Sequence, residues 1–335
     1  MSIEFDNFSE SSNGGTEIIK REVIKRLPED LLNKFQIVTD RFSSLDETKI
    51  RIYWSHLDPQ QCEEMLEFLG YDDKKPLANG GWRKFHKIVF VSYHQMENWI
   101  KRYDIPRSHC TVIKHAINPI EPQEKPKDKI TLVHHCNPQR GLPLLIDVFE
   151  RLCKEYDNIE LKIHSSWKIY GMNEWEENYR EKNLYKRMEN NPKILNIGYL
   201  PNEEVKKSLA SSHIFAYPNI MTETFCISLL ESMSAGCLCV HPDYGCLPET
   251  AANLTMMYSY HEDINMHKEI FYQNLKKAIE IVNDNQIQEH LKKQKEYVDY
   301  LFNWERRIQD WINLLSVLES IPSSKIYKKI SFTYN

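Results

Sequence analysis

The sequence predicts an α/β protein with two doubly wound parallel-sheet domains, and three observations support this prediction. The chain has 335 residues, which exceeds one ordinary domain and suffices for two modest hydrophobic cores. Short apolar runs alternate with amphipathic stretches of helical period along nearly the whole chain. This alternation starts again after a proline-rich, charged segment in the first half of the chain.

The first predicted domain covers residues 1–118 and ends at a linker. Five short hydrophobic runs are its predicted strands: residues 3–5, 36–38, 50–55, 87–92 and 111–114. Helical periodicity follows Gly15, Asp58 and Gln95. Residues 119–128 contain three prolines among charged side chains, a composition typical of linkers. We therefore place the domain boundary in this segment.

The second predicted domain covers residues 129–300. Its expected strands are residues 130–134, 159–164, 194–197, 214–217, 238–241 and 255–258. Amphipathic runs predict helices at residues 142–156, 174–188, 202–211 and 225–235. From residue 261 to residue 318, Leu, Ile and Trp recur at three- and four-residue spacings, so further helices should cover the sheets.

Composition narrows the function classes. The formal net charge of −5 provides no global positive field, so we expect no nucleic-acid binding. Charges interrupt the apolar runs before the roughly 20 residues that a membrane helix needs. Met1 leads into charged residues rather than a signal peptide, so we expect no transmembrane segment and a cytoplasmic location. None of the eight cysteines forms a C-x-x-C pair, which fits reduced, buried thiols.

Cys237 and Cys239 are the cysteines that most need a metal check. A single residue separates them, whereas structural zinc sites use a longer spacer. We therefore expect no metal site.

Two glutamates, Glu223 and Glu231, lie eight positions apart before a run of small residues and Gly236. If a helix starts just after Glu223, about 12 Å of helix axis separates the two carboxylates, a span that suits a sugar and a ribose joined by a diphosphate. The amides of Phe225 and Cys226 would then lie at the helix N-terminus, where phosphate or sugar oxygens are favoured. From spacing alone, two solvated glutamates on a surface helix are the better interpretation.

The whole block, however, resembles the donor-site signature of retaining glycosyltransferase family 4. That signature is an E-x7-E element followed by a small-residue helix end and a glycine before the next strand. In the family the first glutamate contacts the donor sugar and the second holds the nucleotide ribose, so the resemblance assigns these roles to Glu223 and Glu231. The chain departs from the family at Cys226, where glycine is usual, and at Cys246, which replaces the second residue of a usual Gly-Gly pair.

A second block, residues 134–142, lies between a predicted strand and a predicted helix and resembles the family's first loop of the nucleotide domain. Arg140 fills a basic position there, and its guanidinium could neutralise a diphosphate as the leaving group becomes charged. The family's earlier arginine is missing, with His134 or His135 near its place. The alternatives are a solvated arginine at a helix start and two ordinary strand histidines.

Two weaker signals lie in the first domain. Gly14 and Gly15 let the backbone approach a ligand closely, although many ordinary turns contain paired glycines. In the resembling family a glycine-rich loop at this point faces the donor phosphates. His56 ends a predicted strand, where α/β proteins bind ligands, and the family often has a His-Asp near this point, with the histidine close to the transferred sugar. In this chain Leu57 separates His56 from Asp58, and a satisfied loop histidine is the alternative.

Two more segments match the family by position. Tyr199, in a Gly-Tyr-Leu-Pro sequence, lies where the family's chain commonly meets the nucleobase. Residues 302–305 resemble its late F-x-W-E segment, so residues 301–335 should form a crossing helix and tail that return to the first domain. Trp304 and Trp311 are expected to pack rather than bind.

The resemblance implies the GT-B fold, in which two Rossmann-like domains face a cleft. It also implies retaining, metal-independent transfer of a hexose from a UDP- or GDP-sugar to a glycan, lipid-linked or other macromolecular acceptor. No cofactor is implied, and peripheral contact with a membrane stays open. The first alternative is a catalytically silent GT-B module that binds nucleotide sugar or glycan. The second, a nicotinamide-dependent enzyme, is disfavoured because the chain lacks a G-x-G-x-x-G sequence.

Overall fold

A computed structural model describes residues 14–40, 42, 44–68, 75–170 and 173–321. These residues divide into two compact units. Among them, unit 1 contains Ile18–Lys114 and residues 305–321, and unit 2 contains residues 14–17 and His115–Trp304. The segment 119–128, predicted as a linker, belongs to unit 2 in this division. The strand predicted at residues 3–5 lies outside the described residues.

Unit 1 contains a four-stranded parallel sheet in the order β1-β2-β3-β4. Its strands are β1 (Phe35–Val38), β2 (Ile50–Trp54), β3 (Lys87–Phe90) and β4 (Cys110–Val112). Its helices are α1 (Gly15–Arg26, whose first turn belongs to unit 2), α2 (Glu29–Leu32), α3 (Pro59–Phe68), α4 (Tyr93–Tyr103) and the main part of α12 (Trp304–Ser320). The Ser92 side chain caps α4 by accepting from the Gln95 amide at 3.1 Å.

The helix α12 packs on unit 1 through an aromatic contact. The ring of Trp311 is fully buried and meets the ring of Trp54 edge to face, with centroids 4.9 Å apart. Trp304, at the start of the same helix, is also buried. Both tryptophans therefore pack, as expected, and the chain returns to unit 1 after the last helix of unit 2.

Unit 2 contains a six-stranded parallel sheet in the order β10-β9-β8-β5-β6-β7. Its strands are β5 (Ile130–His134), β6 (Ile159–Ile163), β7 (Ile194–Asn196), β8 (Ile214–Ala216), β9 (Leu238–Pro242) and β10 (Met256–Tyr258). The chain runs outward from β5 to β7 and then returns to β8 on the other side of β5. The direction of winding therefore reverses between β5 and β8, the point where doubly wound sheets bind ligands.

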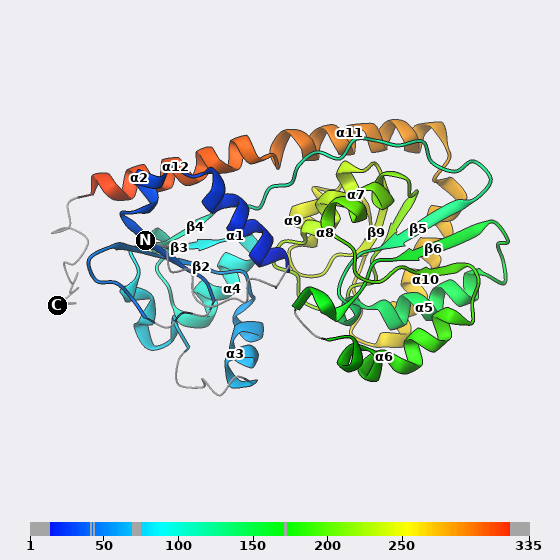
Figure 1. Cartoon of the computed structure of the whole chain (residues 1–335), viewed down its shortest axis with the longest axis horizontal. Coiled ribbons are helices and arrows are strands. Elements are labelled where there is room, and N and C mark those ends of the chain that lie inside the picture. Colours follow the sequence, from blue (N-terminus) through cyan, green and yellow to red (C-terminus); the bar gives the residue numbers. More distant parts are fainter. Residues whose placement is uncertain (1–13, 41, 43, 69–74, 171–172, 322–335) are drawn as a thin grey trace. The chain divides into compact units, whose positions relative to one another are not determined.

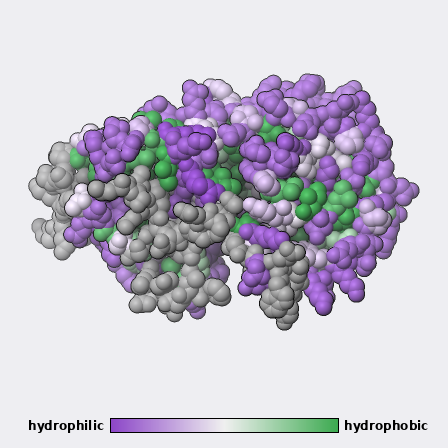
Figure 2. Space-filling view, in the orientation of Figure 1, coloured by the Kyte–Doolittle hydropathy of each residue, from purple (hydrophilic) through white to green (hydrophobic). Residues whose placement is uncertain are grey.

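Helices cover both faces of this sheet (Figure 1). They are α5 (Leu142–Leu152), α6 (Glu174–Glu189), α7 (Asn202–Ala210), α8 (Ile227–Ser234), α9 (Leu247–Ala251), α10 (Ile264–Ile281) and α11 (Asn285–Leu301). The helices α5 and α10 pack together on one face, and α7, α8 and α11 pack on the other. Leu291 and Val298 of α11 are buried, while the outer side of this helix is hydrophilic (Figure 2).

The predicted α/β class with two Rossmann-like parallel sheets is confirmed. Each strand of unit 2 starts and ends within one residue of its predicted limits. Among the described residues, no helix is long and apolar enough to span a membrane. The helices differ more. The helix predicted at residues 142–156 ends at Leu152, the helix Leu247–Ala251 was not predicted, and the helix predicted at residues 225–235 begins only at Ile227.

Candidate functional site

The candidate site of unit 2 lies at the switch point of its sheet. The loop after β5 contains Arg140, and the loop after β8 contains Glu223. Because β5 and β8 are adjacent and parallel, their carboxyl ends meet at the same edge. The fold thus brings together two predicted site residues that are 83 positions apart in the sequence.

The carboxylate of Glu223 is held by two donors. The Arg140 guanidinium donates to Glu223 Oε1, with Nη1 and Oε1 2.9 Å apart. The hydroxyl of Tyr217 donates to the same oxygen in a short hydrogen bond. Burial, followed by the negative charge of Glu223, raises the pKa of Tyr217 well above its ordinary value, so the hydroxyl stays protonated. Sequence reasoning missed Tyr217, which follows β8 directly but belongs to no motif.

Two glycines allow the loops around this carboxylate to approach closely. At Gly245 φ is +66°, and an added Cβ would lie 2.5 Å from the backbone nitrogen of Glu223. At Gly141 φ is +94°, and an added Cβ would overlap the carbonyl oxygen of Pro218. The Cys246 amide also donates to the Glu223 carbonyl at 2.9 Å. The Gly245-Cys246 turn therefore fixes the backbone of Glu223.

The predicted helix start just after Glu223 was wrong. Cys226 adopts a left-handed conformation, with φ 65° and ψ 77°, and α8 begins at the next residue, Ile227. Glu223 therefore lies in a loop outside the helix, and the spacing of about 12 Å along one helix axis does not apply. A non-glycine residue rarely adopts the left-handed conformation of Cys226 without strain.

Phe225 also differs from the expectation, because its amide is not part of a helix. Its side chain is buried, and its ring contacts His115 and Phe302 at centroid distances of 4.9 and 6.0 Å. The first amides of α8 belong to Ile227 and Ser228 instead.

The second predicted glutamate, Glu231, lies on α8 and is buried. Asn202 Nδ2 donates to Glu231 Oε1 at 3.2 Å. Burial raises the pKa of Glu231, while the positive charge of Lys206 and the Asn202 hydrogen bond oppose this shift. Asn202 is the first residue of α7, immediately after the loop that carries Tyr199. Tyr199 is 38% exposed, which leaves its ring accessible to a ligand.

The paired glycines also lie beside α8. Gly14 is buried, and Gly15 is the first residue of α1. A Cβ added to Gly15 would lie 3.3 Å from Cδ1 of Ile227. Gly15 therefore lies against the start of the helix that carries Glu231.

The two histidines near Arg140 are neutral. Burial lowers the pKa of His134 to about 4 and that of His135 to about 3. His134 Nδ1 lies 3.0 Å from the Ala216 carbonyl, and His135 Nε2 lies 2.9 Å from the Ser232 hydroxyl. Neither imidazole therefore supplies the charge of the missing arginine, and Arg140 is the only Arg or Lys in residues 134–142.

His56 belongs to unit 1, where it follows β2 and is buried. Its ring lies 4.5 Å from the Trp54 ring, centroid to centroid. Its amide lies 3.2 and 3.1 Å from the two carboxylate oxygens of Asp40, which also accepts from the Ser55 hydroxyl at 2.9 Å. Burial raises the pKa of Asp40 to about 6, although these hydrogen bonds oppose the shift. Asp40 was missed by sequence reasoning, but its place two residues after β1 was a usable signal.

The cysteines considered as metal ligands bond to the backbone instead. The Cys237 thiol donates to the carbonyls of Leu209 and Ser212, and the Cys239 thiol donates to the Cys237 carbonyl. Within the part of the chain that the structure describes, no group of three His, Cys, Asp or Glu side chains could hold a metal ion.

The family model described as glycosyl transferases group 1 matches residues 114–297. A human phosphatidylinositol N-acetylglucosaminyltransferase subunit is 28% identical over 168 residues, which are 48% of this chain and 33% of that protein. The chain thus spans a third of the length of this relative.

Solved structures share the fold. A glycosyltransferase from Rickettsia africae ESF-5 is 14% identical, with a TM-score of 0.65. The matched region covers 96% of this chain and 85% of the Rickettsia chain. Anabaena HepE in complex with UDP-glucose is 12% identical with a TM-score of 0.62, covering 91% of this chain and 84% of its own. The predicted GT-B fold is therefore confirmed.

Proposed function

Because the chain belongs to the glycosyl transferases group 1 family, we propose that it moves a hexose from a nucleotide sugar to an acceptor, with retention and without a metal ion. The observation that carries this proposal is the Glu223 carboxylate, held by Arg140 and Tyr217 at the switch point of unit 2. This group combines a cation suited to a diphosphate with an oriented carboxylate suited to a sugar.

Each residue has a distinct role in the proposed reaction. Arg140 balances the charge that develops on the leaving diphosphate, together with the amides at the start of α8. Glu223 orients the donor sugar, and Glu231 accepts hydrogen bonds from the ribose hydroxyls. The bond between the anomeric carbon and the phosphate oxygen breaks while the acceptor oxygen bonds to the same face. The acceptor proton passes to the departing phosphate oxygen, so no separate protein base is required.

We propose that donor binding changes the partner of Arg140. The guanidinium is paired with Glu223 through Nη1. A diphosphate offers the guanidinium a second anion, and the sugar hydroxyls offer Glu223 new donors. We propose that the two side chains separate in the donor complex, which leaves Tyr217 to hold the carboxylate.

Other residues would also contact the substrates. We propose that Tyr199 contacts the nucleobase, that Gly14 and Gly15 approach the phosphates, and that His56 lies close to the transferred sugar. Among the expected acceptors we favour a lipid-linked one, because the human relative is named for phosphatidylinositol. A UDP- or GDP-sugar stays the expected donor. The cytoplasmic location expected from the sequence stays a prediction.

The alternative is a GT-B module that binds nucleotide sugar or glycan without turnover. The left-handed Cys226 favours it, because a strained side chain replaces the usual glycine beside the donor site. The human relative is named as one subunit of an enzyme, which is compatible with this alternative.

A thermal-shift screen with UDP-, GDP- and ADP-sugars in the presence of a chelator tests the proposal. A ligand that binds the native state raises the melting temperature. We expect a shift with one nucleotide class, followed by release of the free nucleotide when acceptor is added. A shift without nucleotide release for any acceptor would favour a silent module that binds nucleotide sugar. No shift with any nucleotide sugar would contradict the proposed transfer and leave only a silent module that binds glycan.

A further inference from the structure

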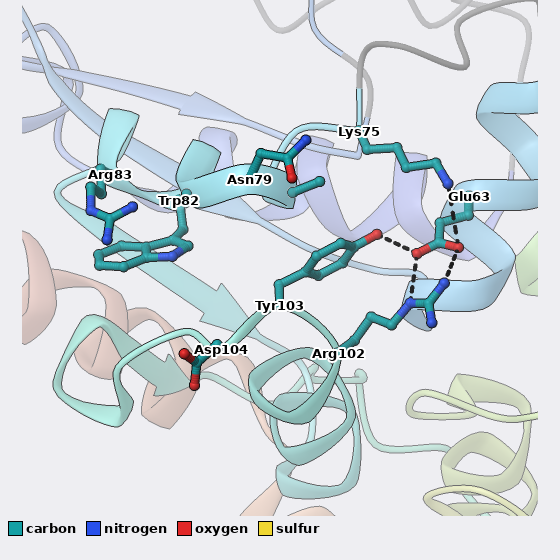
Figure 3. A pocket seen from close by; sticks show the side chains of 10 residues that line it. Glu63, Lys75, Asn79, Trp82, Arg83, Arg102, Tyr103 and Asp104 are labelled. Carbon is teal, nitrogen blue, oxygen red and sulfur yellow. Dashed lines mark hydrogen bonds and ion pairs between the residues drawn. The ribbon is translucent and has the colours of Figure 1, made fainter.

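Unit 1 contains a pocket that the proposed function does not use. Its volume is about 600 Å³, and its lining comes from α3, from the segment Ala78–Lys84 and from the end of α4 (Figure 3). That segment precedes β3, and the end of α4 precedes β4. The pocket therefore lies at the amino-terminal edge of the sheet, whereas His56 lies at the carboxyl-terminal edge.

One guanidinium of this pocket, that of Arg83, lies between a glycine and an aromatic ring. Asn79 and Gly80 both have left-handed backbones, with φ of 51° and 77°. A Cβ at Gly80 would overlap Nη1 of Arg83, so only glycine allows this guanidinium position. The Arg83 guanidinium lies 4.3 Å from the centroid of the Trp82 ring. Among the described residues Arg83 has no carboxylate partner.

Two further cations line the pocket, Lys75 and Arg102, and they share one carboxylate. Arg102 donates to both oxygens of Glu63, at 2.9 and 2.8 Å, and the Tyr103 hydroxyl makes a short hydrogen bond to Oε1 (Figure 3). Lys75 Nζ is 3.6 Å from Glu63 Oε2. The Arg102 and Tyr103 contacts lower the pKa of Glu63 to about 2. Both carboxylate oxygens of Glu63 therefore already accept hydrogen bonds, and Glu63 holds the surrounding side chains in place.

The charged side chains that line the pocket favour an anion. The lining contains three cations, Lys75, Arg83 and Arg102, against two carboxylates. One of these, Glu63, is engaged by its donors, and the other, Asp104, is exposed at the end of α4. An arginine fork and a lysine point charge are the groups that proteins use to bind phosphate.

We propose that this pocket binds a phosphate ester of a small polar molecule. The phosphate would meet Arg83, and the organic part would fill the remaining volume along Trp82 and Asn79 toward Lys75 (Figure 3). A volume of about 600 Å³ exceeds the size of a lone phosphate and falls in the range of ordinary ligand pockets, roughly 300 to 1,000 Å³. The ester comes either from a soluble sugar phosphate or from a lipid headgroup, since both present the same chemistry to the pocket.

Calorimetric titration of glucose 6-phosphate into the full chain tests this proposal, and glucose is the uncharged control. We expect glucose 6-phosphate to bind and glucose not to bind. Arg83→Gln should weaken binding roughly tenfold or more, because it removes a charge-assisted contact with the phosphate. Lys75→Met should weaken binding by a smaller factor, because Lys75 lines the far end of the pocket. The matched control is Arg107→Gln, which removes an exposed arginine of unit 1 that is paired with Glu97 outside the pocket.

A second arm tests the lipid source by cosedimentation with phosphatidylcholine vesicles, with and without phosphatidic acid. Binding that requires phosphatidic acid and Arg83, with no binding of glucose 6-phosphate, supports a headgroup site. Binding of glucose 6-phosphate that requires Arg83 supports a soluble ester. Failure of both probes, or equal binding by wild type and both pocket variants, overturns the proposal. Glu231→Ala should leave either result unchanged, so this test is independent of the donor site.

Discussion

Arg140 Nη1 lies 2.9 Å from Glu223 Oε1, so the cation expected to meet a diphosphate is held by the carboxylate expected to meet a sugar. This ion pair is largely shielded, with side-chain exposures of 22% and 9%. The pair orients both groups. In the proposed function, a bound diphosphate competes with Glu223 for the guanidinium.

Glu223→Gln should separate donor binding from transfer. The neutral amide no longer competes for Arg140, so affinity for the free nucleoside diphosphate should stay equal or rise. Transfer should fall by about 100-fold or more, because the sugar loses its orienting carboxylate. Calorimetry with the nucleotide and a turnover assay measure the two effects. A loss of nucleotide binding together with activity would contradict the assigned roles.

Tyr217→Phe tests a positioning role. The variant removes one hydrogen bond to a carboxylate, worth roughly 1.5 to 3 kcal/mol, and leaves Arg140 in place. We expect kcat to fall about tenfold with little change in the KM for donor.

The matched control for this variant is Tyr185→Phe, because the Tyr185 hydroxyl donates to Glu177 at 2.6 Å in another part of unit 2. It should lower the melting temperature in the same way without changing kcat. Equal kcat values for the two variants would show that Tyr217 is only structural.

Cys226→Gly should stabilise the protein. Left-handed backbone costs a non-glycine residue roughly 1 to 2 kcal/mol, and the greater freedom of unfolded glycine offsets about half of this gain. The control is Ala252→Gly, since Ala252 has φ 49° at the end of α9. Both variants should melt at higher temperature, and only Cys226→Gly should change donor affinity. A lower melting temperature for Cys226→Gly would show that the thiol contributes more than the strain costs.

The pKa of Asp40 predicts how stability depends on pH. Burial raises this pKa to about 6 in the folded state, whereas an unfolded aspartate titrates near pH 3.9. The folded state therefore binds more protons between these values, and the Asp40 contribution to stability falls as pH rises from about 4 to about 6. The full loss is about 3 kcal/mol, at about 1.4 kcal/mol for each pKa unit.

Asp40→Asn should remove this dependence. Thermal melting across the same pH range should show the variant gaining stability relative to wild type as pH rises. Asp46→Asn is the opposite control, because hydrogen bonds from Thr48 lower the pKa of Asp46 and favour its charged form. Its removal should cost stability at the higher pH. Parallel melting curves for wild type and Asp40→Asn would contradict the assignment.

The strands and helices of unit 2 could be predicted because hydrophobic periodicity depends on local sequence. The apolar residues of strands β5 to β10 lie in short runs, and short apolar runs are typical of buried strands. The left-handed Cys226 could not be predicted in this way, because a cysteine carries no signal for positive φ. The helix start was therefore placed too early.

The contacts of the candidate site depend on packing between distant loops. The Tyr217 hydroxyl reaches Glu223 through the fold of the loop that follows β8. The pocket lined by Lys75, Arg83 and Arg102 is formed by separate elements, so the spacing of these residues in the sequence matches no motif. Asp40 is a single carboxylate, and its raised pKa depends on its burial beside His56 and Ser55, which the sequence does not reveal.

Titration of the preferred nucleotide sugar into wild type and Glu231→Ala, with chelator present, tests the donor site most directly. Glu231 is buried beside Asn202, and a ribose would take its charge-assisted hydrogen bonds, each worth roughly 1.5 to 3 kcal/mol. We predict saturable binding by wild type and an affinity at least about tenfold lower for the variant. Equal affinities in the two proteins would contradict the assignment of unit 2 as the donor-binding unit.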